Sequence, residues 1–258
     1  MGGAMLRAWL DQGLDPRGVH VLDPYPNRDI LTLASEKGVA LNAPAEPPEV
    51  LVLAIKPQTL DEASAETAPL AALAGPQTLV ISILAGKTIA NIAARLPHAG
   101  SIVRAMPNLA AAVGRGVTGL FASAALSAER QAAAEALMGA TGAFEWVEDE
   151  RLIDVVTAIS GSGPAYVFYL AECLAEAGAA LGLPRDVAQR LARATVEGAG
   201  ELLFKSRDRT AAELRESVTS RGGTTAAALE ALMAPDGLAP IILRAAEAAR
   251  ARAEALSG

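Results

Sequence analysis

The first half of the chain alternates short apolar runs with stretches in which apolar residues recur at helical spacing. The apolar runs at residues 50–55, 78–84 and 101–106 have the length of strands, and a proline or glycine follows each within two residues. This alternation is typical of a parallel α/β sheet whose strands are covered on both faces. Weaker strand patterns lie at residues 19–23, 116–121 and 144–147, and helices are predicted at residues 1–12, 29–37, 88–96 and 128–138.

The pattern changes near Glu148-Asp149-Glu150, beyond which no convincing strand follows. Long stretches rich in Ala, Leu and Glu are separated there by short breaks at residues 182–184, 206–209 and 221–223. The sequence therefore predicts two domains, an α/β domain over residues 1–149 and an all-helical domain over residues 150–258.

The helix predicted at residues 164–181 is apolar on nearly every side, because its only charges are Glu172 and Glu176, one helical turn apart. A helix that is apolar all round must be buried all round. A bundle formed by residues 150–258 has little room to surround it, so we expect a second copy of the chain to cover part of it. The alternative is a central helix in a monomer.

The chain of 258 residues has a formal net charge of -7, with 22 basic and 29 acidic residues. The basic residues are scattered, which argues against a nucleic-acid partner, since such a partner requires a basic patch. No apolar run approaches the roughly 18 residues of a membrane-spanning helix, and the start of the chain does not resemble a signal peptide. The single cysteine, Cys173, lies in an apolar setting and can form no internal disulfide. The sequence therefore predicts a soluble cytoplasmic protein that binds neither nucleic acid nor membrane.

The start of the chain carries part of a dinucleotide-binding pattern. The segment MGGAM at residues 1–5 opens the first predicted helix, and Asp23 follows Gly2 by 21 residues, where such folds place an acidic residue on the adenosine ribose. The strand and the earlier glycines of the pattern would precede Met1, so the first strand of the sheet is expected to be missing. Asp23 favours an unphosphorylated ribose, whereas Asn27 and Arg28 offer donors to a 2′-phosphate; alternatively, Asp23 begins an ordinary turn.

Three later strands end in loops suited to a nucleotide, at residues 55–58, 85–88 and 106–108. In open α/β sheets, ligands gather outside the carboxyl ends of the strands. The sequence therefore predicts that these loops and the first helical turn hold a dinucleotide together.

Two runs of small hydroxyl and glycine residues open into helices in the second half, at residues 159–166 and 218–225. In the second run, Gly222 and Gly223 allow a positive φ and a close approach, so that successive backbone NH groups can converge on a small carboxylate at the positive end of the next helix. The hydroxyls of Ser220, Thr224 and Thr225 add groups that donate and accept. The alternative is a glycine turn with a threonine N-cap.

The inventory of reactive side chains is small. His20 lies in a predicted strand and His98 in a loop, the sequence contains no metal-ligand cluster, and no Ser-His or Cys-His pair indicates a nucleophile. Hydride transfer from a bound nicotinamide to an electrophilic C=N bond needs little from side chains, because the cofactor performs the difficult step. This inventory favours that reaction.

Residues 156–166, VTAISGSGPAY, and residues 217–225, SVTSRGGTT, resemble the signature of the pyrroline-5-carboxylate reductase family. Supporting segments follow in family order: MGGAM at 1–5, AIKPQ at 54–58, SILAG at 82–86 and RAMPN at 104–108. The resemblance implies a Rossmann-type dinucleotide-binding domain, here without its first strand, and an all-α dimerisation domain, with the active site where the two meet. It also implies reduction of L-1-pyrroline-5-carboxylate to L-proline with NADPH or NADH, by homodimers that often assemble further, commonly into decamers.

Carried over by motif, the Ser220 hydroxyl and the NH groups of Gly223, Thr224 and Thr225 would hold the substrate carboxylate, with Gly222 in the same turn. Thr225 would be the catalytic residue that hydrogen-bonds the ring nitrogen and assists its protonation. The candidate cofactor-binding residues are Met1, Gly2, Ala4, Asn27, Arg28, Ala54, Ile55, Lys56, Pro57, Ile83, Leu84, Ala85, Pro107 and Asn108.

Two features depart from the family pattern. Arg221 stands where many members have proline, which removes a restraint on φ and adds a charge beside the carboxylate site; we expect it to be tolerated, with an altered affinity. The missing strand is the larger departure. Met1 is expected to lie within a longer natural chain, so that a short upstream extension restores cofactor binding; the alternative is a defective copy.

Two rival interpretations remain. A reductase of the same layout that acts on another imine or on a hydroxy acid typically carries a lysine in the first long helix of the helical domain, and residues 164–181 contain none. A regulatory or interaction protein derived from such an enzyme would account for the missing strand. However, the substrate loop of such a protein would be expected to lose its motif as well, and residues 217–225 retain it.

Overall fold

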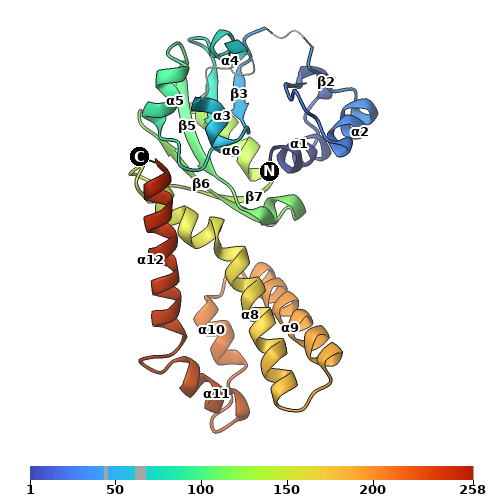
Figure 1. The fold of residues 1–258 in the computed structure, drawn as a ribbon, viewed down its shortest axis with the longest axis vertical. Helices are drawn as coiled ribbons and strands as arrows, with labels where there is room; N and C mark the ends of the chain where they lie inside the picture. The colour runs from blue at the N-terminus through green and yellow to red at the C-terminus, as the bar shows by residue number, and fades with distance from the viewer. Residues whose placement is uncertain (44–45, 62–67, 258) are drawn as a thin grey trace. The chain divides into compact units, whose positions relative to one another are not determined.

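The computed structural model describes residues 1–43, 46–61 and 68–257. The chain divides into two compact units, one formed by Met1–Ser162 with Ala249–Gly258 and the other by Gly163–Ala248. The first unit contains sheets and helices, and the second is built from helices (Figure 1). The boundary between domains that the sequence places at residues 149 and 150 stays a prediction.

The described strands of the first unit form two sheets. In the small sheet, β1 (His20–Val21) and β2 (Ala40–Leu41) pair in parallel. The strands of the larger sheet lie in chain order and are β3 (Val50–Leu53), β4 (Leu79–Ser82), β5 (Ser101–Met106), β6 (Gly116–Ala122) and β7 (Gly142–Trp146). Among the described residues, no strand joins β1 to β3.

The larger sheet is mixed, and the expectation of a purely parallel sheet was wrong at one place. β5 and β6 are antiparallel, with Val103 opposite Ala122, whereas the other neighbouring strands are parallel. The physical reason is the short connection over residues 107–115, since a parallel neighbour needs a crossover of a dozen or more residues. The α/β class of the prediction is confirmed.

Two strands end earlier in the structure than the sequence pattern predicts. β3 ends at Leu53 and β4 at Ser82, so that residues 54–55 and 83–84 belong to the loops that follow. β1 spans two of the five predicted residues, and β2 was missed. The apolar runs therefore include loop residues at the edge of the sheet where a ligand is expected.

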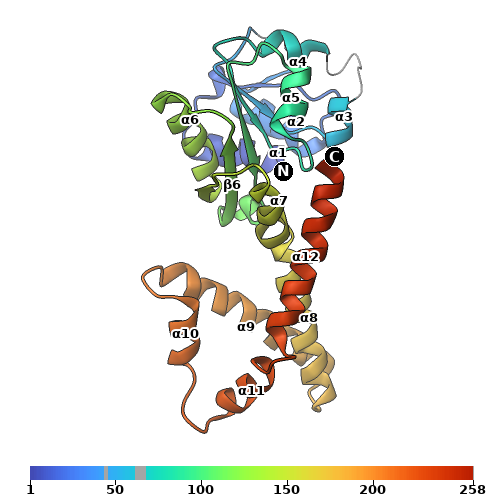
Figure 2. The ribbon, with the colours of Figure 1, turned by 90° about the vertical axis from the view of Figure 1, so that its left-hand side faces the viewer.

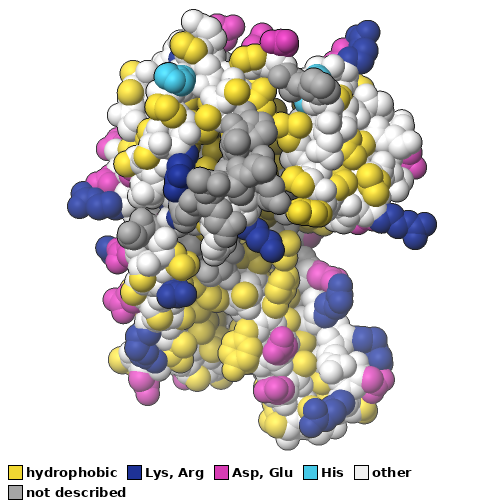
Figure 3. Space-filling model, turned by 45° about the horizontal axis from the view of Figure 1, so that its top comes forward, with side chains coloured by type: hydrophobic (Ala, Val, Ile, Leu, Met, Phe, Trp, Pro, Cys, Tyr) yellow, Lys and Arg dark blue, Asp and Glu magenta, His cyan; other side chains and the backbone are white. Residues whose placement is uncertain are grey.

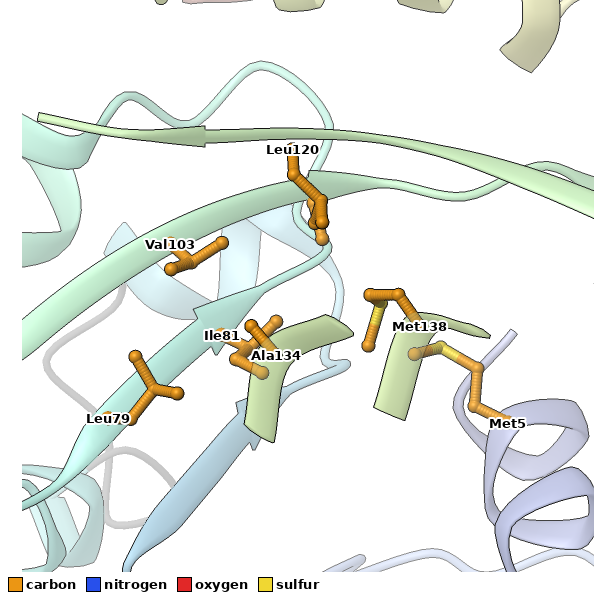
Figure 4. Packing of buried hydrophobic residues seen from close by; sticks show 8 residues of the cluster. Met5, Leu79, Ile81, Val103, Leu120, Ala134 and Met138 are labelled. Carbon is orange, nitrogen blue, oxygen red and sulfur yellow. The ribbon is translucent and has the colours of Figure 1, made fainter. Parts of the chain in front are cut away.

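Helices cover both faces of the larger sheet. On one face, α1 (Gly2–Asp11) and α6 (Ala128–Gly139) bury Met5 and Met138 against Ile81 and Leu120 (Figure 4). The helices of the other face are α3 (Pro57–Asp61), α4 (Ala68–Leu73) and α5 (Ile89–Arg95). All four residues of β4 are buried, which accounts for its continuous apolar pattern. The helix α2 (Arg28–Lys37) packs with α1 over the small sheet.

The chain leaves the larger sheet through α7 (Leu152–Val156), which continues into a π-helix, Thr157–Gly161. The remaining helices are α8 (Gly163–Ala180), α9 (Arg185–Lys205), α10 (Ala211–Ser217), α11 (Thr224–Leu232) and α12 (Leu238–Ser257) (Figure 2). The all-helical prediction for this half is confirmed. No helix within the described ranges is long and apolar enough to span a membrane.

The second unit has little hydrophobic core of its own. Within residues 163–248, all of which are described, the buried hydrophobic side chains are Ala188, Ala192 and Ala246. On α8, Phe168 is 58% exposed and Tyr169 is 66% exposed. Hydrophobic side chains, yellow in Figure 3, also reach the surface between charged ones. The exposure of such an apolar helix in a single chain agrees with the expectation that a second copy covers it.

Candidate functional site

The first turn of α1 lies against the end of β3. A Cβ atom placed on Gly2 would lie 2.9 Å from the Cβ of Ala54, and one on Gly3 would lie 2.8 Å from Cδ1 of Ile30 in α2. The first NH groups of a helix have no acceptor within the helix and form its positive end. The close approach of Gly2 therefore places anion-binding donors beside the carboxyl end of β3, an arrangement that fits the pyrophosphate of a dinucleotide. Met1 and Ala4 belong to the same turn.

The residues expected at the ribose are ordered by side-chain hydrogen bonds. Asn27 caps α2, because its Oδ1 accepts from the backbone NH of Ile30 at 3.0 Å. Arg28 is exposed at the first position of the helix. The side chain of Asn42 accepts from the Asp23 NH at 2.9 Å and donates to the Asp23 carbonyl at 2.7 Å. Asp23 thus lies in a well-ordered turn, with the cation of Arg28 accessible nearby in the chain.

The loops after β3 and β4 leave the sheet at neighbouring strand ends, since Leu53 pairs with Ser82. The Ile83 NH donates to the Leu53 carbonyl at 3.1 Å, which extends the pairing one step into these loops. Among the candidate residues here, Ala54, Lys56 and Ala85 are exposed, Ile55, Pro57 and Ile83 are half-buried, and Leu84 is buried. The structure therefore brings the two predicted loop segments together at one edge of the sheet.

Gly86 connects this edge to the end of the chain. Its φ of +72° is one that residues with a side chain rarely adopt, and a Cβ atom there would lie 2.8 Å from the carbonyl oxygen of Leu256 in α12. The last turns of α12 therefore pack against the loop after β4.

Pro107 and Asn108 follow β5 and are both buried. The Asn108 side chain accepts from the Val117 NH at 3.3 Å and donates to the Ser160 carbonyl at 3.1 Å. This side chain orders the loop and ties it to the π-helix. Direct contact of either residue with a cofactor stays a prediction.

The segment around Ser160, which belongs to the first of the two runs of small hydroxyl and glycine residues, is helical. The Ser160 hydroxyl donates to the Val156 carbonyl at 2.9 Å, and the Ser162 NH donates to the Thr157 carbonyl at 2.8 Å. These two donors are therefore used within the helix. The small residues serve packing, because a Cβ atom on Gly161 would lie 3.1 Å from Cε of Met106 at the end of β5.

The turn over residues 220–223 leads directly into α11. Gly222 has φ of +70°, and Gly223 is the N-cap of the helix. A Cβ atom on Gly223 would lie only 2.4 Å from Ser220 Oγ, so the hydroxyl rests against the glycine. Thr224 and the half-buried Thr225 are the first two residues of α11, where NH groups have no helical acceptor.

One predicted donor of this turn is already engaged. The Gly223 NH donates to the Ser220 carbonyl at 3.0 Å and closes the turn. In this conformation the Gly223 NH is not available to a substrate carboxylate. Binding of a carboxylate by Ser220, Thr224 and Thr225 stays a prediction. Among the described residues, no group of three or more His, Cys, Asp and Glu side chains is placed to hold a metal ion.

Known proteins match the chain over both units. Residues 150–256 match a family model described as pyrroline-5-carboxylate reductase dimerisation. The pyrroline-5-carboxylate reductase of Haemophilus influenzae is 37% identical over 236 residues, which cover 89% of this chain and 84% of that protein. The chain belongs to the pyrroline-5-carboxylate reductase family. The resemblance stated from the motifs is confirmed, and the two rival interpretations are not favoured.

Solved structures of this family share the fold. A pyrroline-5-carboxylate reductase from Coxiella burnetii has a TM-score of 0.88 and 33% sequence identity, covering 99% of this chain and 94% of that one. A pyrroline carboxylate reductase from Plasmodium falciparum, solved with NADP bound, has a TM-score of 0.77 and 24% identity, covering 100% of this chain and 95% of that one. The Rossmann-type fold and the helical dimerisation domain predicted from the sequence are confirmed.

Sequence reasoning missed Asn42 and Gly86. Asn42 has a φ of 53°, in a region where asparagine is enriched, but its contact with Asp23 spans 19 residues and leaves no periodic signal. Gly86 ends the segment SILAG in the loop after β4, and a glycine in such a loop is a signal for positive φ. Its contact with Leu256 depends on the tertiary fold.

Proposed function

We propose that this protein reduces L-1-pyrroline-5-carboxylate to L-proline, the last step of proline synthesis, with NADPH or NADH as the hydride donor. Membership of the reductase family supports the reaction, and the turn that joins Ser220 to the start of α11 is the observation that carries it. A small anionic imine needs a carboxylate site and a proton donor close together. Ser220 and the first turn of α11 offer both.

The substrate half is proposed to act through few groups. The Ser220 hydroxyl and the NH groups of Thr224 and Thr225 bind the carboxylate at the positive end of α11. The Thr225 hydroxyl donates to the ring nitrogen. Reduction breaks the C=N π bond: a hydride forms the new C–H bond at the ring carbon, and the electron pair left on nitrogen takes a proton. Thr225 assists that proton transfer, and Gly222 and Gly223 shape the turn.

The cofactor half is proposed to use the first turn of α1 for the phosphates, Asn27 and Arg28 near the ribose, and the loops after β3, β4 and β5 for the rest of the dinucleotide. The contact of Gly2 with Ala54 supports this assignment, since it places helix-terminal donors at the carboxyl edge of the sheet. When bound, the nicotinamide supplies the hydride. The protein supplies orientation and a place for the substrate charge.

The active form is proposed to be a homodimer in the cytoplasm, and the family resemblance extends this proposal to a decamer. The match to the dimerisation model and the exposed apolar surface of α8 support self-association. The larger assembly and the location rest on the sequence-based expectation.

Exchange of Thr225 tests the proposed function. We expect Thr225→Ala to lower kcat for pyrroline-5-carboxylate by about 100-fold, as for loss of a general acid. Thr225→Ser keeps the hydroxyl and should stay within about fivefold of the wild type. The measurement is steady-state oxidation of NADPH and NADH. Full activity of Thr225→Ala would refute the role of this residue, and absence of turnover by the wild type with the upstream extension in place would refute the reaction.

A further inference from the structure

Glu150 precedes α7 and contacts a loop that is remote in the sequence. Its Oε1 atom accepts a hydrogen bond from the backbone NH of Ile89 at 2.7 Å and another from Nη1 of Arg104 at 3.0 Å. The Arg104 side chain is 5% exposed and that of Glu150 is 27% exposed. One carboxylate oxygen therefore joins the start of α5, the strand β5 and the segment that leads into α7.

Ile89 is the first residue of α5, and its NH is one of the helix donors that lack an acceptor within the helix. Thr88 and Asn91 form a capping box at the same end, and Glu150 adds the acceptor for the Ile89 NH. An internal carboxylate thus occupies the positive end of α5. This end orders the loop and is not a second phosphate site.

The loop after β4 is fixed at both ends. Its near end is paired with β3 through the hydrogen bond from the Ile83 NH to the Leu53 carbonyl. Its far end is fixed by the hydrogen bond from Ile89 to Glu150. The residues assigned to the cofactor are Ile83, at the near anchor, and Leu84 and Ala85, between the two anchors. Their positions therefore depend on both anchors.

Arg104 and the turn before α7 hold Glu150 itself in one orientation. Arg104 lies on β5 opposite Ser82 of β4, and its buried guanidinium needs a negative partner. On the other side, hydrogen bonds from Arg151 lower the pKa of Asp149 to about 2, so that this neighbouring carboxylate is committed to its own turn. Glu150 is the acidic side chain of this segment that reaches the loop.

We propose that Glu150 is a positioning residue for the dinucleotide: it fixes the loop after β4 in the shape that binds the cofactor, without touching the cofactor. This inference rests on the proposed function. It predicts an effect on cofactor affinity that is separate from the effect on stability and from the affinity for pyrroline-5-carboxylate.

The test is the Kd for NADPH, measured by fluorescence titration of purified variants in the absence of substrate. Glu150→Ala removes the acceptor from Ile89, and we expect the Kd to rise about tenfold, the equivalent of one lost charged hydrogen bond. Glu150→Gln keeps a neutral acceptor and should raise the Kd about threefold. Glu148→Gln, at an exposed glutamate two residues earlier, is the matched control and should bind as the wild type does. KM for pyrroline-5-carboxylate should stay within about twofold in all three variants.

A double variant separates positioning from stability. Glu150→Leu combined with Arg104→Met removes the buried charge together with its partner, so the melting temperature should recover relative to Glu150→Ala. The Ile89 NH still lacks its acceptor, so the Kd for NADPH should stay raised. Recovery of the Kd along with the melting temperature would overturn the proposal, as would a folded Glu150→Ala variant with wild-type affinity. Wild-type protein that binds no NADPH would instead refute the proposed function, and the inference with it.

Discussion

Gly222 and Gly223 are adjacent, yet glycine is required at them for different reasons. Gly222 has φ of +70°, and a Cβ atom there would meet nothing within 4 Å. Gly223 has an ordinary φ of -82°, but its Cβ atom would collide with Ser220 Oγ. The first glycine permits a backbone conformation, and the second leaves room for a hydroxyl.

This difference makes the two glycines a matched pair for mutation. Gly223→Ala should displace the Ser220 hydroxyl and raise KM for pyrroline-5-carboxylate about tenfold, with an unchanged Kd for NADPH. Gly222→Ala should lower the free energy of unfolding by about 1 kcal/mol through strain at positive φ, since no side chain is displaced. Steady-state kinetics and denaturant unfolding measure the two effects. An unchanged KM for Gly223→Ala would show that Ser220 does not contact the substrate.

The residue types of a segment indicate which kind of ligand it could bind, but not which hydrogen bonds it forms within itself. The small hydroxyl and glycine residues at 220–225 indicate an anion site before any coordinates are known. The use of the Gly223 NH within the turn is not predictable in the same way, because it depends on the dihedral angles of Gly222 and on the position of the Ser220 carbonyl.

Two elements define the proposed cofactor half, the start of α1 and the end of β3. They meet through Gly2 and Ala54, with 2.9 Å between a Cβ atom placed on Gly2 and that of Ala54. Real Cβ atoms do not approach this closely, so a side chain on Gly2 must push α1 away from the strand. The distance between these two elements is therefore set by the absence of one methyl group.

A compensating pair of substitutions tests this contact. Gly2→Ala should weaken NADPH binding about tenfold, because the first turn of α1 moves from the sheet edge. Ala54→Gly in the same chain removes the colliding methyl group and should recover most of the lost affinity. Titration of each single and double variant with NADPH gives the coupling between the two positions. Equal Kd values for Gly2→Ala and the wild type would contradict the placement of the phosphates at α1.

Element types were predictable where the apolar residues had the length or spacing of one element, as in β5 and α2, and where a long apolar stretch ran without a break, as in α8. The π-helix at Thr157–Gly161 was not, because small residues are compatible with loop and helix, and packing against Met106 decides between them. The antiparallel pairing of β6 follows from the length of its connection, and the predicted strand bounds at residues 106 and 116 already imply that length.

In a single chain, the helical unit leaves many of its large apolar side chains exposed. Phe168 and Tyr169 on α8 are more than half exposed, and α8 has no buried residue in a fully described unit. The family model that matches residues 150–256 is one of dimerisation. The match to the dimerisation model and the exposed apolar side chains of α8 both indicate that the helical half of the chain associates with a second copy.

A charge placed on α8 should disrupt the assembly. Phe168→Glu would bury an unpaired carboxylate in the covered surface, and we expect it to shift the protein from dimer or larger assembly to monomer. Ala132→Glu, at an exposed position of α6, introduces the same charge elsewhere and should leave the mass unchanged. Light scattering after size-exclusion chromatography measures the mass. A dimer that survives Phe168→Glu would exclude this part of α8 from the interface.

The proposed function depends on transfer of a hydride from the nicotinamide to the imine carbon of pyrroline-5-carboxylate. Incubation of the purified protein with NADPH deuterated at the transferable position, followed by mass spectrometry and NMR of the product, tests it most directly. We expect proline with deuterium on the ring carbon that is bonded to nitrogen and does not bear the carboxylate, formed at a rate that falls with Thr225→Ala. Proline without the label, or no proline from folded wild-type protein, would contradict it.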